Sequence, residues 1–122
     1  MSTVKIDNIW IDAEHWAEGE WRPDDEIVDV LVTLIDGSRW EATTCSFKHV
    51  QTLTSRWSRS GECLGGRYFW AKNLILVTDT SRTTIEQTIL DLIENGEFEC
   101  AMAKINLEPN ELKNDSGSLL DS

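Results

Sequence analysis

The sequence predicts a single α+β domain with a mainly antiparallel sheet of about four to five strands and two helices. Three strand-like segments precede the first helical pattern, a tight Asp36-Gly37 turn joins two of them, and two amphipathic segments follow. Strands joined by a tight hairpin pair antiparallel, and the later helices are expected on one face of the sheet. The expected order is βββαβαβ over residues 1–105, followed by a flexible polar tail at residues 106–122.

The first two strands are predicted where β-branched and aromatic residues dominate. Residues 4–11 alternate only in part, whereas residues 27–35 form the clearest strand pattern of the chain. Alternate side chains of a strand share a face, which here groups Val28, Val30, Val32 and Leu34. Between the two strands, residues 12–26 are acidic and irregular, and Gly19 and Pro23 interrupt them.

A hairpin is predicted at Asp36-Gly37, with its return strand at residues 39–44. A two-residue loop would place charged side chains beside the apolar row. One extra residue, as in a type I turn with a glycine bulge at Gly37, keeps every apolar side chain on one face. This second register is therefore expected, and its pairs are Leu34 with Trp40 and Val32 with Ala42.

A short helix is predicted after Ser46, because its hydroxyl suits the N-cap position. Apolar residues follow at spacings of three and four on one helix face: Val50, Leu53 and Trp57. The helix should end before Gly61, and the glycine-rich residues 60–66 predict a flexible turn. A further strand is expected at residues 68–79, which have a strongly apolar centre.

A second helix is predicted to begin at Ser81 or Thr83. Thr83 and Glu86 have the spacing of a capping box, and the Asn95-Gly96 pair suits a helix end. The apolar stripe of this helix consists of Ile85, Ile89, Leu92 and Ile93. Residues 98–105 alternate weakly and predict a last short strand.

The net charge of −11 is unevenly distributed along the chain. Residues 1–30 carry nine acidic and two basic side chains, residues 31–72 carry six basic and three acidic ones, and residues 73–122 are acidic again. Lys and Arg contacts to phosphate supply most non-specific nucleic-acid affinity, so this composition disfavours nucleic acids and anionic membranes as ligands. A basic protein is the partner that the charge favours.

The cellular compartment is expected to be the cytoplasm. No apolar run approaches the roughly 18 residues that a membrane span needs, and the first residues show no secretion signal. The three cysteines are odd in number and lack a CxxC spacing, so no disulfide framework is expected from Cys45, Cys63 and Cys100.

Catalytic and metal-binding signals in the sequence are weak. His15 and His49 are the only histidines, and neither has a recognised ligand spacing, so no metal or other cofactor is expected. Cys63 lies in a glycine-rich loop near arginines, where it could act as a nucleophile with His49 as its base. A small enzyme that uses Cys63 or a carboxylate pair is therefore kept as an alternative function.

The segment 14–26 combines two tryptophans with many carboxylates. Aromatic anchors within a polar rim are typical of protein interfaces, and crowded like charges would be relieved by a basic partner. The competing interpretation is that both indoles merely cover the sheet edge. The predicted partner-binding residues are Glu14, Trp16, Glu18, Glu20, Trp21, Asp24, Asp25 and Glu26.

Small size, acidity and the stretch around Trp16, Trp21, Asp24, Asp25 and Glu26 resemble the immunity proteins of bacterial polymorphic-toxin and contact-dependent inhibition systems. The resemblance is one of general character over residues 1–105 and includes no defining motif. It implies a non-enzymatic cytoplasmic protein that binds and blocks a basic toxin domain, often a nuclease. A small ligand-binding module that uses some of the six tryptophans is a further alternative.

Overall fold

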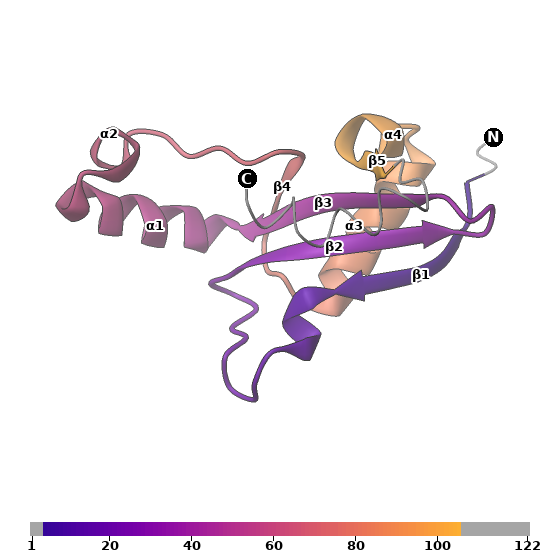
Figure 1. Cartoon of the computed structure of the whole chain (residues 1–122), viewed down its shortest axis with the longest axis horizontal. Coiled ribbons are helices and arrows are strands. Elements are labelled where there is room, and N and C mark those ends of the chain that lie inside the picture. Colours follow the sequence, from indigo (N-terminus) through magenta and orange to yellow (C-terminus); the bar gives the residue numbers. More distant parts are fainter. Residues whose placement is uncertain (1–3, 106–122) are drawn as a thin grey trace, which may run out of the picture.

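The computed structural model describes residues 4–105 and confirms the predicted α+β class and element order (Figure 1). The predicted tail at residues 106–122 lies outside the described residues. The strands are β1 (Ile6–Ile11), β2 (Ile27–Leu34), β3 (Arg39–Ser46), β4 (Leu74–Val77) and β5 (Ala103–Ile105). The helices are the 3-10 turn η1 (Asp12–His15), α1 (Phe47–Ser60), α2 (Glu62–Gly66), α3 (Arg82–Glu94) and α4 (Phe98–Ala101).

The sheet has the strand order β1-β2-β3-β4, and β5 pairs with β3 beside β4. The β1–β2, β2–β3 and β3–β5 pairs are antiparallel, whereas β3 and β4 run parallel. A parallel pair needs a crossover connection, and residues 47–73 provide it. Among residues 4–105, no helix is long and apolar enough to cross a lipid bilayer.

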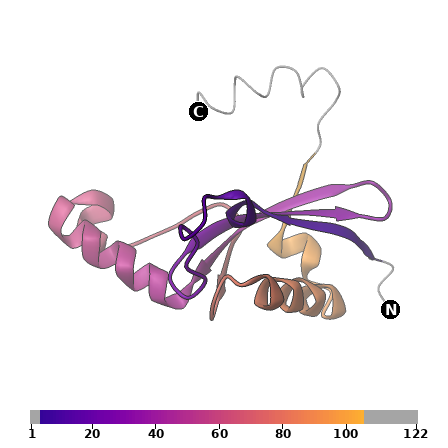
Figure 2. The ribbon, with the colours of Figure 1, turned by 90° about the horizontal axis from the view of Figure 1, so that it is seen from below.

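The hydrophobic core lies between one face of the sheet and α3, which runs along that face (Figure 2). Ile85 and Ile89 of α3 are almost fully buried against the inward residues of β2, which include Val30 and Val32. Phe98 of α4 adds an aromatic contact, its ring lying edge-on to Trp40 with centroids 5.2 Å apart. The buried alternate residues of β2 confirm the face predicted for them.

The predicted hairpin register is wrong by two residues, although the predicted apolar face is right. The observed pairs are Val32 with Trp40 and Val30 with Ala42. Leu34 lies opposite Ser38 instead of Trp40, so the chain turns back earlier than expected: Leu34 N–H donates to Ser38 O (2.9 Å) and Gly37 N–H donates to Leu34 O (2.9 Å). Asp36 Oδ1 accepts from both the N–H and the hydroxyl of Ser38, which holds that residue inside the turn. Gly37 has the positive φ of 88° that a glycine bulge requires.

The local signals for α1 and α3 are confirmed. Ser46 Oγ accepts from His49 N–H, and Gly61 ends α1 in the left-handed conformation. Ser81 caps α3 by accepting from Thr84 N–H. The Thr83–Glu86 capping box does not form, since Ser81 is already the cap, so that expectation was wrong.

Three segments differ from their predicted form. Residues 60–66, expected as a flexible turn, contain the short helix α2, and only Leu74–Val77 of the strand expected at 68–79 is a strand. The segment 98–105 divides into α4 and β5. The division follows from tertiary packing, because Phe98 turns inward to meet Trp40 before the chain rejoins β3.

Candidate functional site

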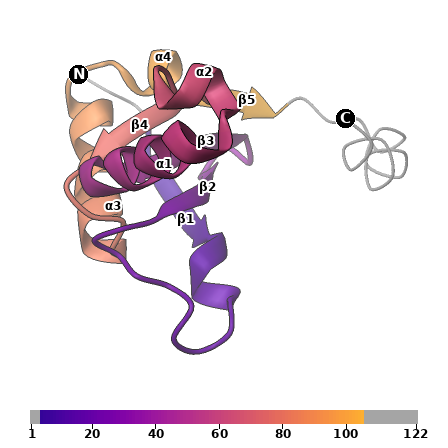
Figure 3. The ribbon, with the colours of Figure 1, turned by 90° about the vertical axis from the view of Figure 1, so that its left-hand side faces the viewer.

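Residues 47–73 form an arm that projects beyond the end of the sheet (Figure 1). The arm consists of α1, α2 and the segment that returns to β4. Figure 3 views the molecule from the arm side, with α1 and α2 in front of the sheet. His49 is the one buried residue of α1, so this helix adds almost nothing to the core beneath the sheet.

Polar contacts fix the base of the arm to the rest of the molecule. His49 Nδ1 donates to Asp25 Oδ1 at 2.8 Å, and the Thr52 hydroxyl donates to Asp25 Oδ2 at 3.1 Å. The hydrogen bond from His49 is the main reason that the pKa of Asp25 lies below its ordinary value. An exposed ion pair between Lys48 and Asp24 adds a weaker contact at 3.3 Å.

The outer end of the arm is a turn of left-handed backbone. Cys63, Leu64 and Gly65 have φ values of 51°, 56° and 71°. Positive φ is uncommon for residues other than glycine, so surrounding contacts must hold this turn. Gly66 supplies one of them: a Cβ at this position would lie 2.1 Å from the carbonyl oxygen of Thr54 in α1.

Phe47 is exposed where α1 begins, and three further large apolar side chains face water on the outer part of the arm; we call these three the arm patch. Leu64 is 70% exposed, Tyr68 is 49% exposed and Trp70 is 73% exposed. Phe69, between the last two, packs instead against Trp57 of α1 with ring centroids 5.8 Å apart. In the segment that returns to β4, Phe69 therefore packs against α1, while Tyr68 and Trp70 on either side of it face water.

The arm is basic, whereas the remainder of the molecule is acidic. Residues 47–73 carry five basic side chains and one carboxylate. Residues 4–46 and 74–105, which we call the body, carry five basic side chains and seventeen carboxylates. Within the described residues, no ion pair involves Arg56, Arg59 or Arg67. The cations of the outer arm are therefore available to a partner.

The tryptophans of the predicted partner-binding stretch lie partly buried against the core. Trp21 Nε1 donates to the Thr80 hydroxyl at 3.2 Å, which fixes this indole in place. Trp16 follows η1 and packs against the same core cluster. Neither indole stands among the exposed large apolar side chains of the described residues.

The carboxylates of that stretch differ in their contacts, and Glu20 Oε1 accepts from Ala17 N–H at 3.1 Å. Glu14 pairs with Arg82 at 2.8 Å, and Asp24 and Asp25 contact the base of the arm. Glu26 accepts from the N–H of the next residue at 3.3 Å. Glu18 and Glu20 are exposed and form no ion pair within the described residues. The structure therefore does not gather the eight predicted residues into one aromatic patch.

Cys63 and His49 do not form a catalytic pair. His49 lies in the first turn of α1 and Cys63 lies beyond its last turn, and a helix of 14 residues is about 21 Å long. His49 instead contacts Asp25. Burial raises the pKa of the Cys45 thiol to about 11, which keeps this thiol protonated at neutral pH. Among the described residues, no group of three His, Cys, Asp or Glu side chains could hold a metal.

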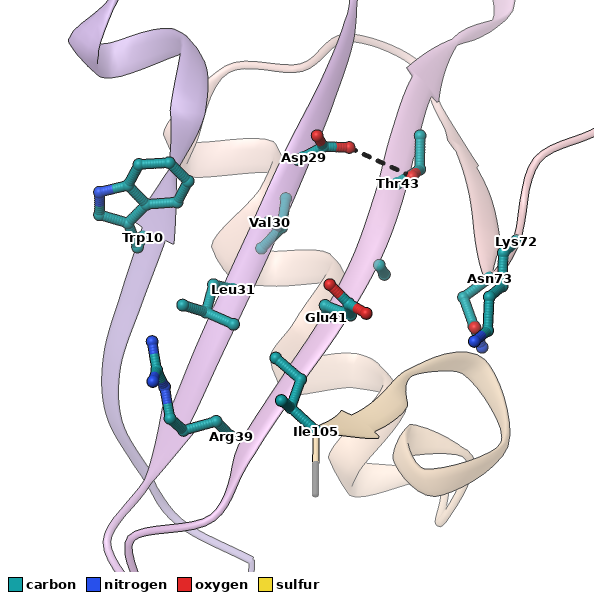
Figure 4. A pocket seen from close by; sticks show the side chains of 11 residues that line it. Trp10, Asp29, Val30, Leu31, Arg39, Glu41, Thr43, Lys72, Asn73 and Ile105 are labelled. Carbon is teal, nitrogen blue, oxygen red and sulfur yellow. Dashed lines mark hydrogen bonds between the residues drawn. The ribbon is translucent and has the colours of Figure 1, made fainter. Parts of the chain in front are cut away.

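Two grooves among the described residues lie away from the hairpin, and a third, of about 190 Å³, lies beside it. The first, of about 410 Å³, crosses the face of the sheet opposite α3, and we call it the sheet groove (Figure 4). Trp10 and Leu31 line one side of it, and its charged residues balance in sign: Asp29 and Glu41 against Arg39 and Lys72. The ligand-module alternative rests on this groove. The second, of about 340 Å³, lies between β1 and α3, and we call it the α3 groove.

Sequence reasoning missed the arm patch. Residues 68–79 were expected as one strand, so Tyr68 and Trp70 were assigned to the sheet rather than to a projecting segment. The available signal was the reversal of charge over residues 31–72, which coincides with a run of aromatic residues. A core strand rarely carries that combination of bulk and positive charge.

Comparison with known proteins returned no relative. No family model, no curated protein and no solved structure matches this chain.

Proposed function

We propose that this protein is a non-enzymatic binding domain that acts by covering a surface of a protein partner, as an immunity protein covers a toxin. The observation that carries the proposal is the arm patch. Leu64, Tyr68 and Trp70 expose apolar surface on a turn that glycines and Phe69 hold in place. Exposed Trp and Tyr side chains on a fixed scaffold are the residues that most often dominate interface energies.

The charges of the arm specify the surface that it meets. α1 is about 21 Å long, so the cations at its outer end lie beyond the Debye length of about 8 Å from its base at physiological salt. The outer arm carries Arg56, Arg59 and Arg67 against Glu62, so its net charge is positive although the whole chain is acidic. The partner surface that fits has an apolar pocket edged by carboxylates for the arm and basic residues opposite the body.

The test is cross-linking followed by affinity measurement. A photoreactive side chain at Tyr68, in the full chain and in its native cell, should capture the partner. Trp70→Ala should then bind the purified partner about 30-fold more weakly, because a hot-spot truncation costs about 2 kcal/mol. Ile35→Ala is the matched control, since Ile35 is 64% exposed on the hairpin, away from the arm. Equal affinity for the two variants would contradict the proposal.

A further inference from the structure

The α3 groove is a depression of mixed character, in which polar and charged residues lie beside Ile6, Ile9 and Leu90. Ile6 and Ile9 of β1 line one wall, and Leu90 of α3 lines the other. Leu90 is 57% exposed, although it belongs to a helix whose opposite face is buried in the core. Leucine at the edge of a groove of about 340 Å³ offers apolar surface to an incoming side chain.

The rim of this groove is negative. Among the described residues that line it, Arg82 is the one cation, and both Glu14 and Glu86 already pair with that guanidinium at 2.8 Å. Asp7 lines the groove without an ion pair among the described residues. Glu94 lies one turn after Leu90, and the last turn of α3 contains no basic residue to offset the helix dipole. The rim thus has an excess of carboxylates.

The arm has the opposite character, with apolar side chains among arginines that form no ion pair with residues 4–105. It also points away from the body, with α2 at the far end of the molecule from α3 (Figures 1 and 2). An arm with this direction cannot reach the α3 groove of its own chain. A second copy can bring its arm to that groove, because the two surfaces match in both polarity and charge.

We propose that the arm patch of one copy docks into the α3 groove of a second copy, so that the protein assembles head to tail. The contact is heterologous: each copy offers an arm to one neighbour and a groove to another. Trp70 and Tyr68 meet Leu90, and Arg67 meets the carboxylates of the rim. This inference rests on the proposed function, because it uses the same arm patch.

Sedimentation velocity of the full chain, from low micromolar to several hundred micromolar, tests the proposal. The wild type should sediment above the monomer mass of 13.9 kDa as concentration rises. Raising the ionic strength from about 0.15 M to about 1 M shortens the Debye length from about 8 Å to about 3 Å and should weaken the assembly. Ile35→Ala should assemble like the wild type, since Ile35 lies on neither surface.

Two variants give a result specific to head-to-tail docking. Trp70→Ala removes the arm contact and keeps the groove, whereas Leu90→Glu removes the groove contact and keeps the arm. Each should be monomeric alone, and an equimolar mixture should form a dimer and nothing larger. Both positions are exposed, so neither variant should change the circular dichroism spectrum or the unfolding midpoint.

Three results would overturn the inference: a wild type that stays monomeric throughout, a Trp70→Ala protein that still assembles, or a mixture that stays monomeric. These results separate it from the proposed function. A monomeric wild type whose cross-linked partner is still lost in Trp70→Ala refutes self-assembly alone. A Trp70→Ala variant that alters neither self-association nor partner binding refutes both.

Discussion

Asp25 connects the segment that precedes β2 to α1, which follows later in the chain. Its two carboxylate oxygens accept from His49 Nδ1 and the Thr52 hydroxyl, both on α1. The hydrogen bond from His49 lowers the pKa of Asp25, and partial burial opposes this effect only in part. A carboxylate with a depressed pKa stabilises the fold above its unfolded pKa, and this contribution disappears as the pH falls through the folded pKa.

Asp25→Asn should therefore lower the free energy of unfolding at pH 7 by about 1 kcal/mol, the usual net value of such hydrogen bonds. The difference from wild type should shrink below pH 3.8, the ordinary pKa of this group, because protonation then weakens the same contacts in the wild type. Urea unfolding followed by tryptophan fluorescence at pH 7 and pH 3 measures both. Asp24→Asn is the control and should change little, since its ion pair with Lys48 is exposed. A pH-independent difference would show that the charge of Asp25 is irrelevant.

The cysteines should differ in reactivity. Cys45 is buried, and its pKa of about 11 leaves almost no thiolate below pH 9, whereas Cys100 is exposed. Iodoacetamide at pH 8, with peptide mass spectrometry over time, should label Cys100 and leave Cys45 unmodified in the folded protein. Labelling of Cys63 faster than Cys100 would revive the alternative of a cysteine enzyme.

At the level of elements, the ends of the helices depend on neighbouring residues, whereas the pairing of the strands does not. The ends of α1 follow from Ser46 and Gly61, and those of α3 from Ser81 and the Asn95-Gly96 pair, because caps act within one turn. The parallel pairing of β4 with β3 depends on residues far apart along the chain, so no local pattern predicts it. The arm patch was missed for that reason, since the amphipathic face of α1 could equally have covered the sheet.

Gly66 should be the most sensitive position of the arm turn. Gly66→Ala meets both a φ of 84° and a Cβ placed 2.1 Å from the Thr54 carbonyl oxygen, so it should destabilise the protein by more than about 2 kcal/mol. Gly65→Ala has a similar φ of 71° but meets no atom within 4 Å, so it should cost about 1 kcal/mol. Urea unfolding of the two variants isolates the steric effect. Equal losses would mean that the close approach of Gly66 to α1 is unimportant.

At the level of the whole molecule, the projecting arm is basic and the body is acidic. Five basic side chains and one carboxylate occupy the arm, and seventeen carboxylates with five basic side chains occupy the body. The alternation of charge along the sequence anticipates this division, but only the fold shows that the basic part stands clear of the rest (Figure 1). The acidic stretch with Trp16 and Trp21, favoured from sequence, instead lends its indoles to the core.

The arm leaves the sheet at Ser46 and returns at Leu74, in strands that pair directly with each other. Its two ends are therefore held together by the sheet whatever lies between them, and the entropy of closing such an excursion grows only with the logarithm of its length. The outer residues 61–70 are thus carried by a sheet whose pairing does not depend on their side chains. Substitutions at its exposed positions, such as Leu64 and Trp70, should therefore change what the arm contacts and leave the sheet beneath it folded.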